Sequence, residues 1–178
     1  MAYAFVPARY NYGKRKGPAL ALVVHMAEGG NTVNYLKNNP PRGVSVHFVL
    51  ERSGRIVQML PLSKASGSID PGRLRTTNDR PYSGYNAEIV QHGFSAVKSI
   101  LGAWSRDPNS AIISIEVEGF ARNGPNEKQR EALVRWSRDM RKKLPTLRGV
   151  LGHRDFANYK ACPGKFIPWE NMAFEGHG

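Results

Sequence analysis

Two histidines and the single cysteine of the chain are the residues whose types and surroundings could hold a metal ion. His25 follows an apolar run, His153 lies in residues 151–155 (LGHRD), and Cys162 lies in residues 161–164 (ACPG). Imidazole and thiolate both suit zinc, and a catalytic zinc site takes three protein ligands and leaves one position for water. Structural zinc sites usually show paired spacings such as C-x2-C, which this sequence lacks. The pattern therefore favours a catalytic Zn²⁺ centre over a structural one.

Each of these residues taken alone has a simpler interpretation. A histidine at the end of a strand is more often a hydrogen-bonded polar residue, and a lone cysteine is more often a small buried hydrophobe. The close succession of the His153 and Cys162 motifs is the more specific signal. Asp155 could bind the other ring nitrogen of His153 and so orient it. A surface ion pair or a helix cap is an equally good interpretation of that carboxylate.

Short strands must position these side chains. The apolar residues 19–24 predict a buried strand that leads to His25, and residues 148–152 predict a strand that leads to His153. The remaining predicted strands are residues 44–50 and 55–60, joined in a hairpin by the Ser53-Gly54 turn, and residues 111–117. In the last of these, alternation puts Ile113, Ile115 and Val117 on one face and Ser114, Glu116 and Glu118 on the other.

One long helix is predicted at residues 126–144. Asn126 suits its N-cap, Gln129 stands at the capping-box position, and Pro145 ends it. Its apolar stripe is Ala132, Leu133, Trp136 and Met140. A shorter helix is predicted after a Thr32 cap, residues 63–109 suggest broken helix towards Trp104, and residues 170–178 suggest a loose tail. This order of elements predicts an α/β fold with a central mixed sheet flanked by helices.

The bulk composition suits one domain over residues 1–178, with a core at about 19–169. The chain is 40% hydrophobic, and its one cysteine excludes an intrachain disulfide. A domain of about 150 residues buries about 70% of its unfolded surface, so no such bond is needed. The formal net charge of +12 predicts attraction to a polyanion, although solubility alone would also explain it. We expect no nucleic-acid partner, because neither helix-turn-helix nor zinc-finger spacing is visible and the aromatic residues do not interleave the basic ones.

Six segments in this order resemble the zinc-dependent N-acetylmuramoyl-L-alanine amidases, a family that includes phage lysozyme-type amidases, cell-wall recycling amidases and peptidoglycan recognition proteins. The resemblance covers about residues 20–169. The segments are residues 23–25 (VVH), 44–48 (VSVHF), 53–58 (SGRIVQ), 113–119 (ISIEVEG), 152–155 (GHRD) and 160–164 (KACPG). The resemblance implies the amidase fold and hydrolysis of the peptidoglycan amide between N-acetylmuramic acid and L-alanine.

The resemblance also implies roles for individual residues. His25, His153 and Cys162 match the three zinc ligands. Glu116 matches the general base of the bacterial members, and Lys160 matches a residue that assists catalysis. A structural ion pair for Glu116 and a solvated surface position for Lys160 are the plain alternatives, and Glu118 is the reserve candidate for the base. His47 matches a family histidine beside the site, with a supporting role.

Two departures from the family pattern affect the site. Val46 stands where some members have a catalytic tyrosine, so proton transfer must fall to another residue, for which Glu116 is the best candidate. Residues 63–109 are longer than expected and lack a clear W-H-x-G-like segment, of which residues 65–67 (ASG) are the candidate remnant. The substrate contacts of this region are therefore open.

The resemblance and the charge together favour a phage endolysin whose partners are peptidoglycan and anionic wall polymers. The alternatives are a non-catalytic peptidoglycan-binding protein, which would typically lack the cysteine ligand, and an intracellular enzyme that recycles soluble muropeptides. No apolar run is long enough to span a bilayer. The apolar residues 19–26 follow several basic residues, but they are too few and start too late for a signal peptide. We therefore expect the protein in the host cytoplasm until its release to the wall.

Overall fold

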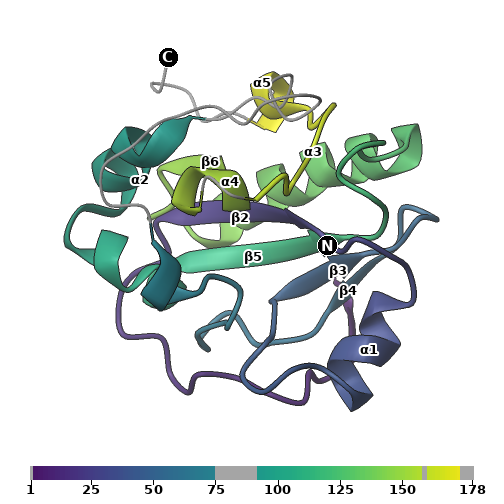
Figure 1. The fold of residues 1–178 in the computed structure, drawn as a ribbon, viewed down its shortest axis with the longest axis horizontal. Coiled ribbons are helices and arrows are strands. Elements are labelled where there is room, and N and C mark those ends of the chain that lie inside the picture. The colour runs from purple at the N-terminus through teal and green to yellow at the C-terminus, as the bar shows by residue number, and fades with distance from the viewer. Residues whose placement is uncertain (1, 75–91, 158–159, 173–178) are drawn as a thin grey trace.

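A six-stranded mixed sheet organises the chain, with the strand order β1-β4-β3-β5-β2-β6. The computed structural model describes residues 2–74, 92–157 and 160–172. The strands are β1 (Ala4–Phe5), β2 (Ala21–Met26), β3 (Phe48–Leu50), β4 (Ile56–Gln58), β5 (Ile112–Val117) and β6 (Gly149–Gly152). The helices are α1 (Thr32–Asn38), α2 (Gly93–Leu101), α3 (Glu127–Lys143), α4 (His153–Phe156) and α5 (Trp169–Met172), with short 3-10 turns at Pro71–Arg73, Gly102–Arg106 and Pro108–Ser110. The predicted α/β fold is confirmed (Figure 1).

The middle of the sheet is parallel and buried on both faces. β2 pairs in parallel with β5 on one side and with β6 on the other. Every residue of β2 is buried. Strands that are covered on both faces need continuous apolar runs rather than alternation, which is why residues 19–24 are apolar throughout. The polar His25 follows this apolar run in β2, and it is only 3% exposed.

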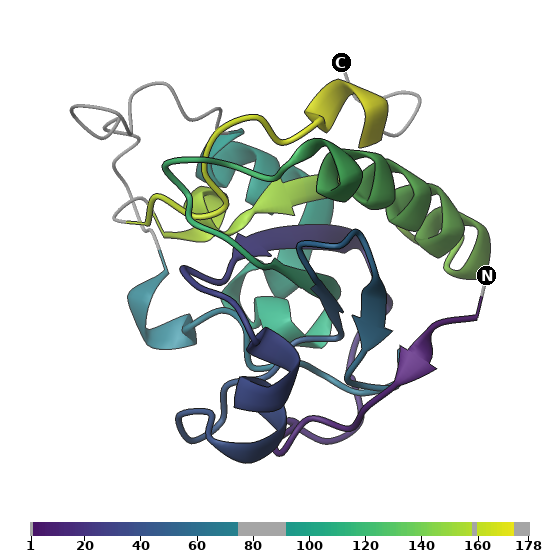
Figure 2. The ribbon, with the colours of Figure 1, turned by 90° about the vertical axis from the view of Figure 1, so that its right-hand side faces the viewer.

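Helices cover the two faces of the sheet in different places (Figures 1 and 2). α3 packs Trp136 and Met140 against the face that carries Leu22, Val24 and Ile115. On the opposite face, α2 and α4 cover the β2 and β6 side, and α1 covers β3 and β4 through Leu36. His25 and Glu116 lie on this second face, because they alternate with residues that pack under α3. The candidate site therefore lies on the sheet face opposite α3.

The capping of α3 follows the sequence signal. The Asn126 side chain accepts the backbone N–H of Gln129 at 3.0 Å, and the Gln129 side chain accepts the N–H of Asn126 at 3.0 Å. This reciprocal capping box satisfies two amides that the helix itself leaves free. α3 then runs to Lys143, close to the predicted end before Pro145.

The structure departs from the sequence prediction in three places. The strand expected at residues 44–50 is confined to Phe48–Leu50, and Val44 and Val46 before it line a cavity. α1 starts at Thr32, but its N-cap is Asn31. β1 precedes the expected core and pairs in parallel with β4.

The region of residues 63–109 is mostly turns and short helices, among them α2, and residues 75–91 lie outside the described part of the chain. In the predicted tail, α5 ends at Met172, and residues 173–178 likewise lie outside it. No described helix is long and apolar enough to cross a membrane.

Candidate metal centre and active site

The register of the sheet brings His25 and His153 together. Val24 on β2 pairs with Gly152 on β6. Each histidine is the next residue along its chain, and parallel strands advance in the same direction, so the two rings meet at one end of the sheet. Their Nδ1 atoms lie 3.1 Å apart, and their ring centroids are 4.7 Å apart. Pairing of β2 with β6 thus brings together two residues that are 128 positions apart in the chain.

Cys162 completes the group from the loop after α4. The ligand atoms of His25, His153 and Cys162 all lie within 4.8 Å of one another. The backbone N–H of Met26 donates to the Cys162 Sγ at 2.9 Å, an interaction that stabilises a thiolate. The N–H of Arg154 donates to the carbonyl of Cys162 at 2.9 Å, which ties the loop to the start of α4.

The donor set fits a zinc ion. Two nitrogen ligands at about 2.0–2.1 Å from a tetrahedral metal would be about 3.3 Å apart. The observed separation of the two Nδ1 atoms, 3.1 Å, is close to that value. The Nε2 atom of His25 is buried and has no hydrogen-bond partner. Without a metal, this group would consist of a buried thiol and two packed imidazoles, one of which would donate a hydrogen bond to the other.

The protonation states of the two histidines suit metal binding, whereas that of the cysteine depends on the metal. Burial, followed by the neighbouring His153 and Lys160, lowers the pKa of His25 well below its usual value. Burial and Lys160 lower the pKa of His153 to about 4. Both rings are therefore neutral at pH 7, with lone pairs available for a metal. Burial, then the charge of Glu116, raises the pKa of the Cys162 thiol, so a cation is required to hold it as a thiolate.

Glu116 stands next to His25 on the adjoining strand. The two residues are register partners in the β2–β5 ladder. The carboxylate is partly buried, and burial followed by repulsion from Glu28 raises its pKa to about 8, against the opposing effect of Lys160. A carboxyl group poised near neutral pH beside a metal-type cluster can accept and return a proton.

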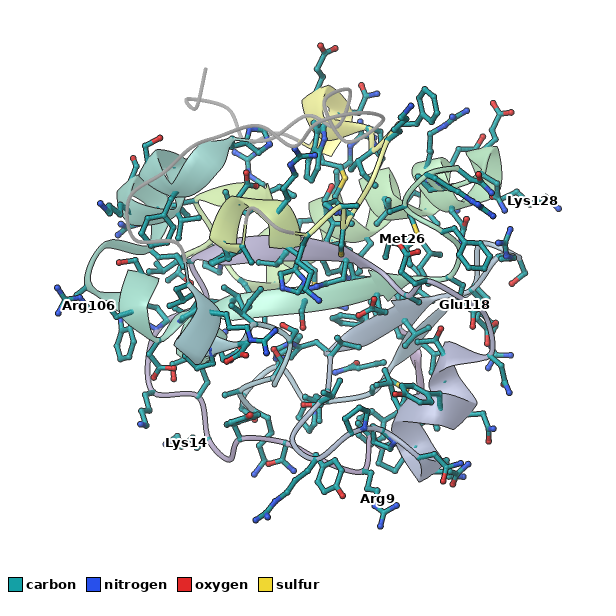
Figure 3. The ribbon with its side chains drawn as sticks, in the orientation of Figure 1. Arg9, Lys14, Met26, Arg106, Glu118 and Lys128 are labelled. Carbon is teal, nitrogen blue, oxygen red and sulfur yellow. The ribbon has the colours of Figure 1, made fainter. Side chains whose placement is uncertain are left out.

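One cavity of about 840 Å³ joins these groups. Glu116, Lys160 and the three candidate ligands all line it. Figure 3 shows the described side chains on the ribbon, with Met26, a residue of the cavity wall, labelled. The structure thus brings together all five residues that the sequence nominated, from β2, β5, α4 and the loop that follows α4.

Glu118 lies outside this cavity, and its carboxylate makes hydrogen bonds that stabilise the fold. Its Oε1 accepts the N–H of Thr32 at 2.7 Å, and its Oε2 accepts the N–H of Arg52 at 3.4 Å. It is 8% exposed and does not line the cavity. These bonds fix the start of α1 and the turn after β3, so the geometry favours Glu116 over Glu118 as the base.

In the part of the chain that the structure describes, the Asp155 carboxylate does not contact the ring of His153. Its carboxylate accepts the backbone N–H groups of Gly152, His92 and Gly93, at 2.7, 2.6 and 2.8 Å. Of the two alternatives for Asp155, the structure supports the helix cap, and the bond to the ring of His153 is not formed. Its bond to Gly152 still fixes the backbone just before His153.

His47 is buried behind the cavity wall. Its Nδ1 accepts the N–H of Ser114 at 3.1 Å, and its Nε2 donates to the carbonyl of Lys64 at 2.9 Å. The ring thus joins β5 to the loop that follows β4. This arrangement fits the supporting role that the resemblance implies.

The sequence did not single out several residues of the cavity wall. Tyr12, Arg42, Ser68 and Arg73 line it. Gly67, which the sequence analysis named within the candidate ASG remnant, lines it as well. Glu28 also lines it, in the left-handed region at φ 53°. Such a backbone is uncommon for a non-glycine residue, but it leaves no mark in the residue type, so no sequence pattern could have located it.

Comparisons with solved structures agree with the fold of this chain. The structure is similar to an N-acetylmuramoyl-L-alanine amidase, LysC, from Clostridium intestinale, with a TM-score of 0.56 at 16% identity, covering 97% of this chain and 95% of that one. It is also similar to the Ph2119 endolysin of a Thermus scotoductus bacteriophage (TM-score 0.58, 17% identity, 92% and 88% covered). A third similar structure is the Drosophila peptidoglycan recognition protein SD (TM-score 0.55, 14% identity, 93% and 85% covered).

The sequence comparisons address the family itself. A search of curated proteins finds no significant match. The family model described as N-acetylmuramoyl-L-alanine amidase matches residues 15–165, which span all three candidate ligands, Glu116 and Lys160. This chain therefore belongs to the N-acetylmuramoyl-L-alanine amidase family.

Proposed function

We propose that the protein is a zinc-dependent hydrolase of the peptidoglycan amide that joins the lactyl group of N-acetylmuramic acid to L-alanine. The observation that carries this proposal is the convergence of Glu116, Lys160 and the His25–His153–Cys162 group in one cavity. Water adds to the lactyl carbonyl and the C–N bond breaks, which leaves a carboxylate on the sugar and a free amine on the alanine.

His25, His153 and Cys162 would hold the zinc ion. Bound there, zinc supplies Lewis acidity that polarises the carbonyl and makes water a better nucleophile. The metal-binding groups are the two neutral imidazoles and the thiol of Cys162, to which Met26 donates its backbone N–H. Three protein donors are the number that catalytic zinc sites use.

Glu116 would move the protons. As a carboxylate it takes a proton from the attacking water, and as an acid it delivers that proton to the departing amine. Its raised pKa, about 8, reflects a buried position beside Glu28, and positive charge nearby favours the carboxylate form. Lys160, which lines the same cavity, would stabilise the oxygen that becomes negative during the reaction.

Three cations of the cavity wall can bind the peptide side of the substrate. Arg42, Arg73 and Lys160 line the cavity, together with the carboxylates of Glu28, Asp70 and Glu116. Arg73 also contacts Asp70 at 3.5 Å, so its guanidinium is partly engaged within the wall. Guanidinium groups bind carboxylates in a fixed planar geometry, and the peptide stems of peptidoglycan carry carboxylates. The part of the cavity beside Arg42 and Arg73 is therefore the natural place for the stem.

A peptidoglycan-binding protein without activity is the main alternative function. The similarity to a peptidoglycan recognition protein shows only that the fold is shared. The complete ligand group, with Glu116 beside it, favours an enzyme, because binding alone does not require a third ligand or a buried carboxyl group at this place. The similarity to a phage endolysin and the net charge of +12 favour action on the wall after release from the host cytoplasm, rather than recycling of soluble muropeptides.

Digestion of purified peptidoglycan by the zinc-loaded protein tests the proposal. Mass spectrometry should find intact glycan strands and released peptides with a new amino terminus at alanine. The Glu116→Gln protein serves as the matched inactive control. Release of shortened glycan fragments, or of peptides cut within the stem, would contradict the assigned bond. Binding of peptidoglycan with no product at all would favour the non-catalytic alternative.

A further inference from the structure

Two exposed phenylalanine rings lie on neighbouring segments just beyond the elements that carry the candidate site. Phe120 follows β5 and is 37% exposed, and Phe166 lies between Cys162 and α5 and is 64% exposed. Among the described residues, Phe166 is the most exposed large hydrophobic side chain. Neither ring lines the active-site cavity or the smaller cavity beside α1. A single exposed apolar side chain is ordinary, but two on adjoining segments indicate a surface that meets a partner.

Two glycines allow these segments to pack directly against each other. A Cβ atom on Gly124 would collide with the carbonyl of Lys165, and a Cβ atom on Gly164 would collide with the carbonyl of Ala121. The Lys165 N–H donates to the Ala121 carbonyl at 3.2 Å, and the Gly124 N–H donates to the Phe120 carbonyl at 3.0 Å. The backbone of both segments is therefore fixed, and the two rings belong to one surface.

The backbone conformation keeps the ring of Phe166 in solvent. Its φ is 60°, in the left-handed region, which is a genuine outlier for a bulky residue. The next residue, Ile167, is 6% exposed and packs in the same core cluster as Trp136. The chain thus anchors Ile167 in the core while it turns the neighbouring ring outward. Strained backbone of this kind costs energy, and it is found mainly at sites that bind ligands or partners.

Two arginines border the rings. The guanidinium carbon of Arg122 lies 5.7 Å from the centroid of the Phe120 ring. A Cβ atom built on Gly119, the residue before Phe120, would lie 3.6 Å from the Nη2 atom of Arg52. Both arginines are exposed, and in the part of the chain that the structure describes neither forms an ion pair with a carboxylate. Guanidinium groups bind phosphate oxygens in a planar bidentate geometry, so these two cations are available for an anionic partner.

Apolar rings bordered by cations fit an anionic lipid surface better than the other candidate partners. A phenyl ring lacks the hydroxyl or N–H group through which tyrosine and tryptophan bond a sugar. A second copy of the chain would bring two net charges of +12 together, and like charges repel. In a bilayer, by contrast, the rings leave water among the acyl chains while the guanidinium groups stay at the phosphates.

We propose that the patch formed by Phe120, Phe166, Arg52 and Arg122 docks the protein on an anionic phospholipid bilayer. The N–H of Ala121, next to Phe120, donates to the Glu28 Oε1 of the cavity wall at 2.9 Å, so the patch adjoins the cavity. Docking holds the cavity beside the bilayer, within reach of the wall layers nearest to it. This lipid binding goes beyond the proposed amidase function and does not depend on it.

Vesicle sedimentation tests the proposal. Vesicles of equal parts phosphatidylglycerol and phosphatidylcholine should bind the zinc-loaded protein, and pure phosphatidylcholine vesicles should bind it much more weakly, because the arginines require anionic headgroups. Phe166→Ser should lower the partition coefficient on the mixed vesicles about tenfold, the effect of removing one ring from the acyl chains. Phe5→Ser removes a phenyl ring of β1 that is 53% exposed, and this matched control should bind as the wild type does. Equal losses in the two variants, or no loss in Phe166→Ser, would overturn the proposal.

A charge variant tests the cationic part of the patch. Arg122→Gln should lower the partition coefficient on the mixed vesicles about fivefold. Lys14→Gln removes one charge from an exposed lysine of the N-terminal segment, which Figure 3 labels, and should have a much smaller effect. At 1 M salt the wild type should keep part of its binding while Phe166→Ser keeps none, because salt screens charge but does not weaken apolar insertion. Identical losses in Arg122→Gln and Lys14→Gln would mean that net charge alone attracts the protein, and would refute a defined patch.

The double variant Phe120→Ser/Phe166→Ser distinguishes lipid from other partners. It should sediment with lipid-free peptidoglycan as the wild type does. Loss of that binding with unchanged vesicle binding would assign the patch to the wall and overturn the proposal. A wild-type dimer that becomes a monomer in the double variant, measured by sedimentation velocity, would assign the patch to a second copy instead. If the double variant unfolds, Phe166→Ser alone serves for both measurements.

Activity separates this inference from the proposed function. Neither ring lines a cavity, so kcat on a soluble muropeptide should be the same in the double variant and in the wild type. A wild-type protein that binds the mixed vesicles but cleaves no muropeptide would refute only the amidase proposal. A wild-type protein that cleaves the muropeptide but does not bind the vesicles would refute only the lipid surface.

Discussion

His25 and Glu116 are register partners on adjacent parallel strands, β2 and β5. Both side chains lie on the sheet face that is not covered by α3. A proposed metal ligand and a proposed base are thus positioned by ladder hydrogen bonds at the centre of the sheet rather than by flexible loops. Only Cys162 and Lys160 reach the site from a loop, and the Met26 and Arg154 amides hold that loop through Cys162.

Glu116→Gln should retain the fold and the metal but lose most turnover. Glutamine keeps the size of the side chain and removes the group that accepts and returns the proton. General acid–base groups typically contribute about 10²–10⁴-fold to the rate. Steady-state kcat on a soluble muropeptide, with zinc content measured in the same sample, checks this expectation.

Glu118→Gln is the matched control for that carboxylate. Its carboxylate accepts the amides of Thr32 and Arg52 outside the cavity. The variant should therefore unfold at a lower temperature while keeping substantial activity. If Glu118→Gln were inactive while folded, and Glu116→Gln were close to wild type, the wrong carboxylate would have been assigned.

The protein should bind one zinc ion per chain through His25, His153 and Cys162. Cys162→Ser removes the soft ligand and should weaken zinc binding strongly and abolish cleavage. Zinc bound only to the native state also raises the apparent stability, so a chelator should lower the melting temperature of the wild type far more than that of Cys162→Ser. Elemental analysis and thermal unfolding measure both effects. A metal-free Cys162→Ser protein with full activity would refute the zinc mechanism.

The sequence predicted the elements that carry strong local signals. The capping box of α3 and the apolar run of β2 both have physical causes within a few residues of chain. The ligand group could be nominated because the motifs around His153 and Cys162 match a known family. The alternation in residues 111–117 also placed Glu116 on one face correctly, opposite Ile115 and Val117.

Other features depend on contacts between distant segments and leave no local pattern. The carboxylate of Asp155 could bond either the ring of His153 or nearby amides, and only the packing of α2 against α4 brings the His92 and Gly93 amides to it. Val44 and Val46 have strand-forming side chains, yet they face the cavity. The short β1 becomes a strand only because β4 is available for pairing.

His47 should make the fold sensitive to acid. Burial is the main cause that lowers its pKa to about 4, compared with about 6.5 in the unfolded chain. Between these values the unfolded state binds a proton that the native state does not, so stability falls as the pH decreases from 6.5 towards 4. The loss from this residue between pH 7 and pH 5 should be about 2 kcal/mol.

Comparison with His47→Gln isolates this contribution. Denaturant unfolding of both proteins at pH 7 and pH 5 gives two changes in the free energy of unfolding. The effects of His25 and His153 are common to both proteins and cancel in the difference. The variant should be less stable at pH 7, because the Ser114 and Lys64 bonds are disturbed, but should lose less on acidification. Equal losses in the two proteins would show that His47 is protonated in the native state.

The positive charge of the chain should hold the enzyme to anionic walls. Lysine and arginine number 26, against 14 aspartate and glutamate residues. Arg135, Arg138 and Lys142 on α3 are exposed at spacings that place them on one helix face. Attraction between exposed charges is screened over about 8 Å at physiological salt and about 3 Å at 1 M. Sedimentation with intact walls should therefore decrease steeply as salt rises, and less protein should sediment when these three residues are replaced by glutamine.

Cleavage of a small neutral muropeptide should change little over the same range of salt concentration, which controls for damage to the fold. If wall binding were the same at low and high salt, the charge would serve solubility alone, and docking would have to come from the substrate groove.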